Sequence, residues 1–107
     1  MTTTAQKKIR IVIADDHRTM REGLRVLMNS QPDLEVVGEA ADGREAIRLA
    51  HQLAPDVLLM DITMAGMNGL EATKKVKEQC PNIRVLTLTR HTDDGFLKQL
   101  LAAGASG

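Results

Sequence analysis

Aromatic residues and an excess charge of one sign are both lacking in this sequence of 107 residues. It has one phenylalanine, no tyrosine and no tryptophan. Its core must therefore be aliphatic, and the aromatic platforms on which single-stranded nucleic-acid binders stack bases are missing. The 14 basic and 14 acidic residues cancel to a formal net charge of +0. Without a one-signed electrostatic field, we expect no direct contact between this chain and nucleic acid.

Cysteine and long apolar runs are also scarce. The single cysteine, Cys80, cannot form an internal disulfide, and we interpret it as a small apolar residue at a helix end. The longest apolar runs, such as 11–14 and 57–60, are four residues long, whereas a membrane-spanning helix needs about 18. Residues 1–8 are polar, with no apolar signal region behind them. These absences favour one small cytoplasmic domain.

Apolar residues recur with alternating strand-like and helix-like spacing along the chain. Four short, mostly apolar segments predict strands: Ile9–Ala14, Leu34–Ala40, Asp56–Met60 and Ile83–Thr89. Four longer segments predict helices: Thr19–Ser30, a helix that follows Asp42, a helix that carries Leu70 to Cys80, and Asp93–Ala103. Because strands and helices alternate regularly, we expect an α/β fold with a doubly wound parallel sheet, in the strand order 2-1-3-4.

The predicted helices carry signals for their packing and for one of their ends. In the first, Met20, Leu24, Leu27 and Met28 lie on one stripe that should face the core. In the third, the expected apolar face consists of Leu70, Thr73, Val76 and Cys80. Asp42 is the predicted N-cap of the second helix, because Glu45 follows it at the spacing of a capping box.

Acidic residues stand where the first and third predicted strands end. Asp15 and Asp16 directly follow the first strand, Asp61 follows the third, and Thr89 ends the fourth. In a sheet of order 2-1-3-4, strands one and three are neighbours at the switch point, so these carboxylates should converge. Their mutual repulsion calls for a hard divalent cation such as Mg²⁺. A carboxylate held beside Mg²⁺ can act as a nucleophile toward a phosphoryl group.

Each of these residues has a simpler interpretation when it is taken singly. The pair Asp15 and Asp16 could form a turn or a helix cap, Asp61 could cap a loop, and Thr89 could merely end a strand. Their common place at strand ends favours the pocket. His17 follows the acidic pair, but an oxygen-rich site favours a hard ion over one that prefers imidazole. We therefore interpret His17 as a solvent-side residue near the first helix.

The motifs at these strand ends resemble the receiver domain of two-component response regulators. The resemblance runs from Ile9 to the end of the chain and includes the Asp15-Asp16 pair, Met60 to Met64 followed by Gly69, Val85–Thr89 and Ala102–Gly107. Asn68 to Thr73 and the final Ala-Gly-Ala-Ser-Gly are most similar to the NarL/FixJ (LuxR-type) subfamily of transcriptional regulators. The resemblance implies a flavodoxin-like receiver fold over residues 9–107, after a polar leader at 1–8.

The same resemblance implies a role for each matching residue. Asp61 would accept a phosphoryl group from a phosphohistidine on a sensor histidine kinase. Asp15, Asp16, Asp61 and the backbone carbonyl of Thr63 would hold Mg²⁺, with Asp15 acting through water. Thr89 would be the switch hydroxyl, and Thr63 and His91 would tune the lifetime of the phosphoryl group. The chain would then be a signalling domain that catalyses only its own phosphorylation and dephosphorylation.

Two departures from the family pattern lead to further expectations. Ala65 stands where the family usually has a proline in the loop after the phosphoacceptor. The family's fifth strand, with its phosphate-pairing lysine and switch aromatic, and its helix-turn-helix output domain have no counterpart in these 107 residues. We therefore expect Ile83–Thr89 to be a sheet edge, and the chain to self-associate through this strand and the helix Asp93–Ala103.

Two other functions are compatible with parts of the pattern. A hydrolase of the haloacid-dehalogenase type also forms an aspartyl phosphate, but it needs a second acid two residues beyond its nucleophile, where this chain has Thr63. A pseudo-receiver would act only as a protein-interaction module. The absent fifth strand favours that alternative, and the intact acidic triad argues against it.

Overall fold

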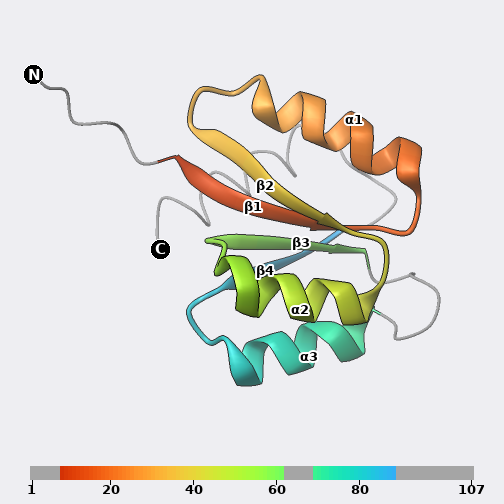
Figure 1. The fold of residues 1–107 in the computed structure, drawn as a ribbon, viewed down its shortest axis with the longest axis vertical. Coiled ribbons are helices and arrows are strands. Elements are labelled where there is room, and N and C mark those ends of the chain that lie inside the picture. The colour runs from red at the N-terminus through yellow and green to blue at the C-terminus, as the bar shows by residue number, and fades with distance from the viewer. Residues whose placement is uncertain (1–7, 62–68, 89–107) are drawn as a thin grey trace, which may run out of the picture.

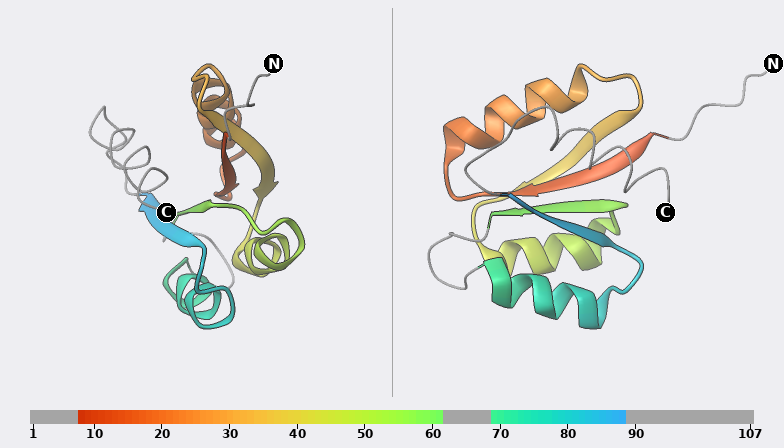
Figure 2. Two further views of the ribbon diagram at one scale, coloured as in Figure 1. Left: turned by 90° about the vertical axis from the view of Figure 1, so that its left-hand side faces the viewer. Right: turned by 180° about the vertical axis from the view of Figure 1, so that it is seen from behind.

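The computed structural model describes residues 8–61 and 69–88. In chain order the elements are β1 (Ile9–Ala14), α1 (Arg18–Asn29), β2 (Leu34–Ala40), α2 (Gly43–Leu53), β3 (Val57–Asp61), α3 (Gly69–Gln79) and β4 (Arg84–Leu88). The strands form one parallel sheet in the order β2-β1-β3-β4. Figures 1 and 2 show α1 on one face of this sheet and α2 and α3 on the other. The predicted α/β class and the strand order 2-1-3-4 are confirmed.

The core lies on both faces of the sheet because β1 and β3 point alternate side chains in opposite directions. On one face, Val12 and Ala14 of β1 belong to a buried cluster with residues of α2 and α3. On the other, Ile11 and Ile13 belong to a cluster with Leu24 and Met28 of α1. Residues 11–14 and 57–60 are fully buried. This explains why the sequences of the two central strands are continuously apolar.

Both ends of α2 are fixed by specific hydrogen bonds. At its start, the Asp42 carboxylate accepts from the Glu45 backbone N–H at 2.8 Å, which confirms the predicted N-cap. The Glu45 side chain accepts in return from the N–H of Ala41, one residue before the cap. At its end, the Arg10 guanidinium donates to the carbonyls of Leu53 and Ala54 at 2.8 and 3.1 Å. The start of the helix is therefore fixed by its own capping residues, and its end is tied to β1 through Arg10.

Three predicted core residues are exposed instead. Met20 and Leu27 of α1 are 43% and 48% exposed, so only Leu24 and Met28 of the predicted stripe are buried. Leu70 of α3 is 63% exposed, because the helix turns Gly69, Ala72 and Val76 toward the core. Helical spacing correctly grouped the residues of α1 on one side. It did not show how narrow the contact between that side and the sheet is.

Several element bounds differ by one residue from those predicted. The first helix begins at Arg18 instead of Thr19, and the third ends at Gln79, just before Cys80. The third strand runs from Val57 to Asp61, so Asp61 is its last residue and does not follow it. Thr89, the predicted helix Asp93–Ala103 and most of the leader at 1–8 lie outside the described residues. Among residues 8–61 and 69–88, the structure has no helix long and apolar enough to cross a membrane.

Candidate functional site

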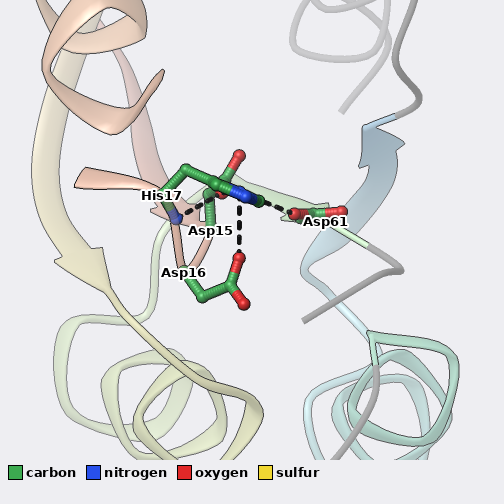
Figure 3. A group of neighbouring side chains, drawn as sticks. All are labelled: Asp15, Asp16, His17 and Asp61. Carbon is green, nitrogen blue, oxygen red and sulfur yellow. Dashed lines mark hydrogen bonds and ion pairs between the residues drawn. The ribbon is translucent and has the colours of Figure 1, made fainter. Parts of the chain in front are cut away.

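The ends of β1 and β3 bring Asp15 and Asp61 together. Ala14, the last residue of β1, is paired with Met60 of β3, and Asp15 and Asp61 are the residues that follow this pair. Both are buried, with 4% and 7% of their surface exposed. They are the only buried charged residues in the part of the chain that the structure describes. Figure 3 shows them with Asp16 and His17 in one group. The predicted convergence of the three carboxylates is confirmed.

The turn after β1 is held in place by contacts from two elements, β2 and α1. The Asp15 backbone N–H donates to the carbonyl of Ala40, at the end of β2, at 3.0 Å. The Asp15 carbonyl accepts from the guanidinium of Arg21 in α1. Arg21 also donates from Nε to the Glu39 carboxylate at 3.4 Å. The backbone of the acidic pair is thus fixed by β2 and α1 before any ligand arrives.

His17 lies inside this acidic group although its side chain is 71% exposed. Its Nδ1 is 3.0 Å from Asp15 Oδ1, 3.0 Å from Asp16 Oδ1 and 4.0 Å from Asp61 Oδ2. Its backbone N–H donates to Asp15 Oδ1 at 2.8 Å. The expected solvent exposure is confirmed, but the ring contacts the carboxylates, which the sequence interpretation missed. Its direct succession to Asp15 and Asp16 was the available signal.

The carboxylates change the protonation of His17. Its pKa is raised above the ordinary value of 6.5, chiefly by the hydrogen bond to Asp15 and next by the charges of Asp16 and Asp15. Both effects favour the imidazolium over the neutral ring. The acidic group therefore provides a place where positive charge is stabilised.

The four side chains have the composition of a cation site. Asp15, Asp16, His17 and Asp61 each offer one ligand atom, and these atoms lie within 4.8 Å of one another. Oxygen ligands from carboxylates suit Mg²⁺, which usually keeps several waters when proteins bind it. The burial of Asp15 and Asp61 beside each other adds a second reason, because a bound cation offsets their repulsion. The residues present thus fit the predicted Mg²⁺ ion.

Some predicted site residues cannot be placed in this group. Thr63, Thr89 and His91, together with Ala65 of the loop after Asp61, lie outside the described residues. Their proposed roles rest on the sequence. Cys80 lies close to the core, as expected, but its Sγ is also 3.7 Å from His51 Nδ1.

In α/β domains with an open parallel sheet, the carboxyl edge of the strands at the switch point is the usual place for a ligand, and here it carries three carboxylates. Residues 11–107 match the response regulator receiver domain. The transcriptional regulatory protein LiaR of Bacillus subtilis is 45% identical over 97 residues, which are 91% of this chain and 46% of LiaR. The match with a LuxR-family response regulator structure from Aurantimonas has 40% identity and a TM-score of 0.75, over 94% of this chain and 72% of that one.

A second solved structure gives the same result. The match with the signal receiver domain of the putative response regulator NarL from Mycobacterium tuberculosis has 37% identity and a TM-score of 0.75, over 94% of this chain and 82% of that one. The chain therefore belongs to the response regulator receiver domain family and has the flavodoxin-like receiver fold. Its relatives are regulators of the LuxR and NarL type. It spans about half the length of LiaR.

Proposed function

We propose that this receiver domain accepts a phosphoryl group on Asp61 from a phosphohistidine of a sensor histidine kinase, in the presence of Mg²⁺. The observation that carries the proposal is the meeting of Asp15, Asp16 and Asp61 at the ends of two adjacent strands. Family membership supports the reaction type, since a receiver domain is the phosphoacceptor partner of a histidine kinase. Asp15, Asp16, Asp61 and the backbone carbonyl of Thr63 are the proposed ligands of the ion.

Asp61 is the best placed of the three carboxylates to act as the nucleophile. It is the last residue of β3, which lies between β1 and β4. Asp61 is paired with Leu88 of β4, and Met60 just before it is paired with Ala14 of β1, so the position of Asp61 is fixed by the sheet. Its side chain is 11% exposed, which leaves an opening for a phosphodonor. The Asp15 side chain is more buried and accepts a hydrogen bond from the His17 backbone N–H. Asp16 lies on the turn after β1, where the chain has left the sheet.

The proposed step forms a bond between an Asp61 carboxylate oxygen and phosphorus. The bond between phosphorus and the kinase imidazole nitrogen breaks, and the leaving imidazole keeps the electron pair and takes up a proton. Bound Mg²⁺ would neutralise the charge that develops on the transferred oxygens. Asp15 and Asp16 contribute by holding that positive charge next to Asp61. In this proposal the Thr89 hydroxyl then donates a hydrogen bond to a phosphoryl oxygen, and this movement of Thr89 changes the surface of the domain.

The test is phosphorylation of the chain by acetyl phosphate, a small phosphodonor that replaces the kinase. With Mg²⁺, we expect intact-mass measurement to show one added phosphoryl group in the native chain and none in Asp61→Asn. Asp33→Asn is the matched control, because Asp33 is an exposed carboxylate before β2 and away from the acidic group. It should be labelled as fully as the native chain.

Two results would contradict this assignment. Label that persists in Asp61→Asn would identify a different nucleophile. No label in the native chain, with Mg²⁺ bound, would favour the pseudo-receiver alternative, in which the domain only binds other proteins.

The relatives indicate which process the phosphorylated domain would control. LiaR is a transcriptional regulatory protein, and this chain covers 46% of it. We therefore propose that the phosphorylated domain controls a transcription-regulating output domain of a longer protein in the cytoplasm. The chain itself would act as a phosphoacceptor for signalling, without turnover of metabolites and without direct contact to nucleic acid.

We also propose that this chain self-associates through β4. Among the described residues, β4 pairs with β3 alone and forms one edge of the sheet. An edge strand presents backbone groups to which another chain can pair. Sedimentation at micromolar concentration should show oligomers of the native chain. Thr87→Lys, which puts a charge at an exposed position of β4, should shift them toward monomer. Equal monomeric behaviour of both chains would contradict the proposal.

A further inference from the structure

The His17 imidazole occupies the position of a fourth ligand in the acidic group. Figure 3 shows the ring directed at the carboxylates, not away into solvent. One ring atom, Nδ1, is the atom nearest to all three acids, at 3.0, 3.0 and 4.0 Å from Asp15, Asp16 and Asp61. The magnesium site proposed above uses oxygen ligands only and gives this nitrogen no role.

The spacing of these atoms suits an ion with six ligands. When each ligand is about 2.1 Å from an octahedral cation, neighbouring ligand atoms are about 3.0 Å apart and opposite ones about 4.2 Å. The distances from Nδ1 to the Asp15 and Asp16 oxygens match neighbouring ligands. The distance to Asp61 lies close to that of an opposite ligand. The widest separation in the group, 4.8 Å, needs only a small shift of the side chains.

Nitrogen and oxygen ligands select different ions. Carboxylate and water suit Mg²⁺, whereas imidazole suits transition metals such as Co²⁺, Ni²⁺ and Zn²⁺. Mg²⁺ gains little from exchanging a water for an imidazole. A transition metal at the same place gains a ligand that it prefers. A histidine in this position therefore raises the affinity of the site for transition metals and leaves the affinity for Mg²⁺ nearly unchanged.

We propose that His17 is a metal-selectivity residue, whose Nδ1 binds a transition-metal cation directly at the site formed by Asp15, Asp16 and Asp61. The inference rests on the proposed function, because it concerns the same cation site. The backbone of His17 is held in a position that suits a metal ligand, because its N–H donates to Asp15 Oδ1 at 2.8 Å. The exposed side chain can turn toward the ion without disturbing the core.

The test compares Co²⁺ with Mg²⁺ in the native chain and in two variants, by calorimetric titration at a pH above the raised pKa of His17, where its imidazole is neutral. His17→Ala should weaken Co²⁺ binding by about tenfold or more, since even indirect partners of metal ligands contribute 10- to 100-fold. Its Mg²⁺ affinity should change much less. His17→Asn, with an amide oxygen near the place of Nδ1, should keep Mg²⁺ binding and lose the preference for Co²⁺.

A second readout identifies the ligand atom. Paramagnetic Co²⁺ should shift the proton NMR signals of one imidazole far outside their normal range, and His17→Ala should abolish those signals. His51→Ala is the matched control, because His51 is an exposed histidine with a cysteine sulfur 3.7 Å away. Its loss should leave the main Co²⁺ affinity and the shifted signals unchanged.

The outcomes separate this inference from the proposed function. Equal Co²⁺ affinity in the native chain and His17→Ala would overturn the selectivity role. Equal loss of both ions in His17→Ala would overturn it too, and would show that His17 only holds the carboxylates in place. If these results come with Mg²⁺ binding and phosphorylation at Asp61, only the selectivity role fails. If neither ion binds and Asp61 is not labelled, the proposed function fails as well.

Discussion

At the scale of the residue, the acidic group depends on which charges the fold forces together. The burial of Asp15 and Asp61 side by side is unfavourable without compensation. His17 supplies part of this compensation, because its ring lies 3.0 Å from two of the carboxylates. A bound cation would supply more. The same negative field can thus be balanced by a protonated imidazole or by a metal ion, and the two should oppose each other.

The protonation of His17 gives a direct measure of that balance. In the metal-free chain we expect NMR titration to give His17 a pKa above 6.5, because Asp15 and Asp16 stabilise the imidazolium. Folding raises the pKa of His17. The ion pairs of its imidazolium therefore stabilise the fold below pH 6.5, and this stabilisation is lost as pH rises through the pKa of the folded state. Saturating Mg²⁺ should lower this pKa, since the cation cancels the field of the carboxylates.

Asp15→Asn provides the control for the titration. It removes the Asp15 charge and leaves only a neutral amide oxygen as acceptor, so the pKa of His17 should move back toward the value in the urea-unfolded chain. A native pKa at or below 6.5 would show that the ring does not lie against the carboxylates in solution.

The carboxylates of the site follow from the sequence more directly than its histidine does. Asp15, Asp16 and Asp61 could be predicted because parallel strand order alone brings the ends of β1 and β3 together. The place of His17 depends on the path of the turn before α1 and on a side-chain rotamer, which periodicity does not encode. Backbone N–H donation from His17 to Asp15 bends that turn back over the acidic group.

At the scale of the element, the ends of helices were easier to predict than the width of their buried faces. The cap of α2 depends on Asp42 and Glu45, which are neighbours in sequence, so local chemistry was sufficient. The exposure of Met20 and Leu70 depends on how α1 and α3 sit on the sheet. That geometry is set by residues distant in sequence. The helices were therefore predicted correctly, but some residues assigned to their buried faces are exposed.

The end of α2 contains a strained residue. Ala54 has a φ of 45° and a ψ of 59°, the left-handed conformation that a Cβ atom disfavours. We expect Ala54→Gly to raise the free energy of unfolding by about 1 kcal/mol, because glycine adopts this conformation without the Cβ clash. Thermal unfolding should show a melting temperature a few degrees higher.

A glycine elsewhere in the same helix should act in the opposite direction. Gln52 is exposed in the last turn of α2, and Gln52→Gly should lower the free energy of unfolding by a similar amount. If both variants are destabilised, the left-handed turn at Ala54 is not a source of strain in solution.

At the scale of the whole molecule, the site joins parts of the chain that are distant in sequence. Asp15 and Asp16 follow β1, and Asp61 ends β3, with α1, β2 and α2 between them along the chain. The two strands are adjacent in the sheet, and core clusters on both faces hold them there. Unfolding separates the carboxylates, so a ligand that needs all of them binds the folded state alone.

This arrangement predicts that Mg²⁺ stabilises the fold. At a hundredfold excess of free ion over its dissociation constant, the gain is about 2.7 kcal/mol, provided that the unfolded chain does not bind the ion. Thermal unfolding should therefore occur several degrees higher in Mg²⁺ than in Na⁺ at equal ionic strength, which removes general screening as the cause. Asp16→Ala should lose most of the shift, and Asp33→Asn, with its carboxylate outside the group, should keep it. An equal shift in the native chain and Asp16→Ala would mean that the ion stabilises the domain from somewhere other than the acidic group.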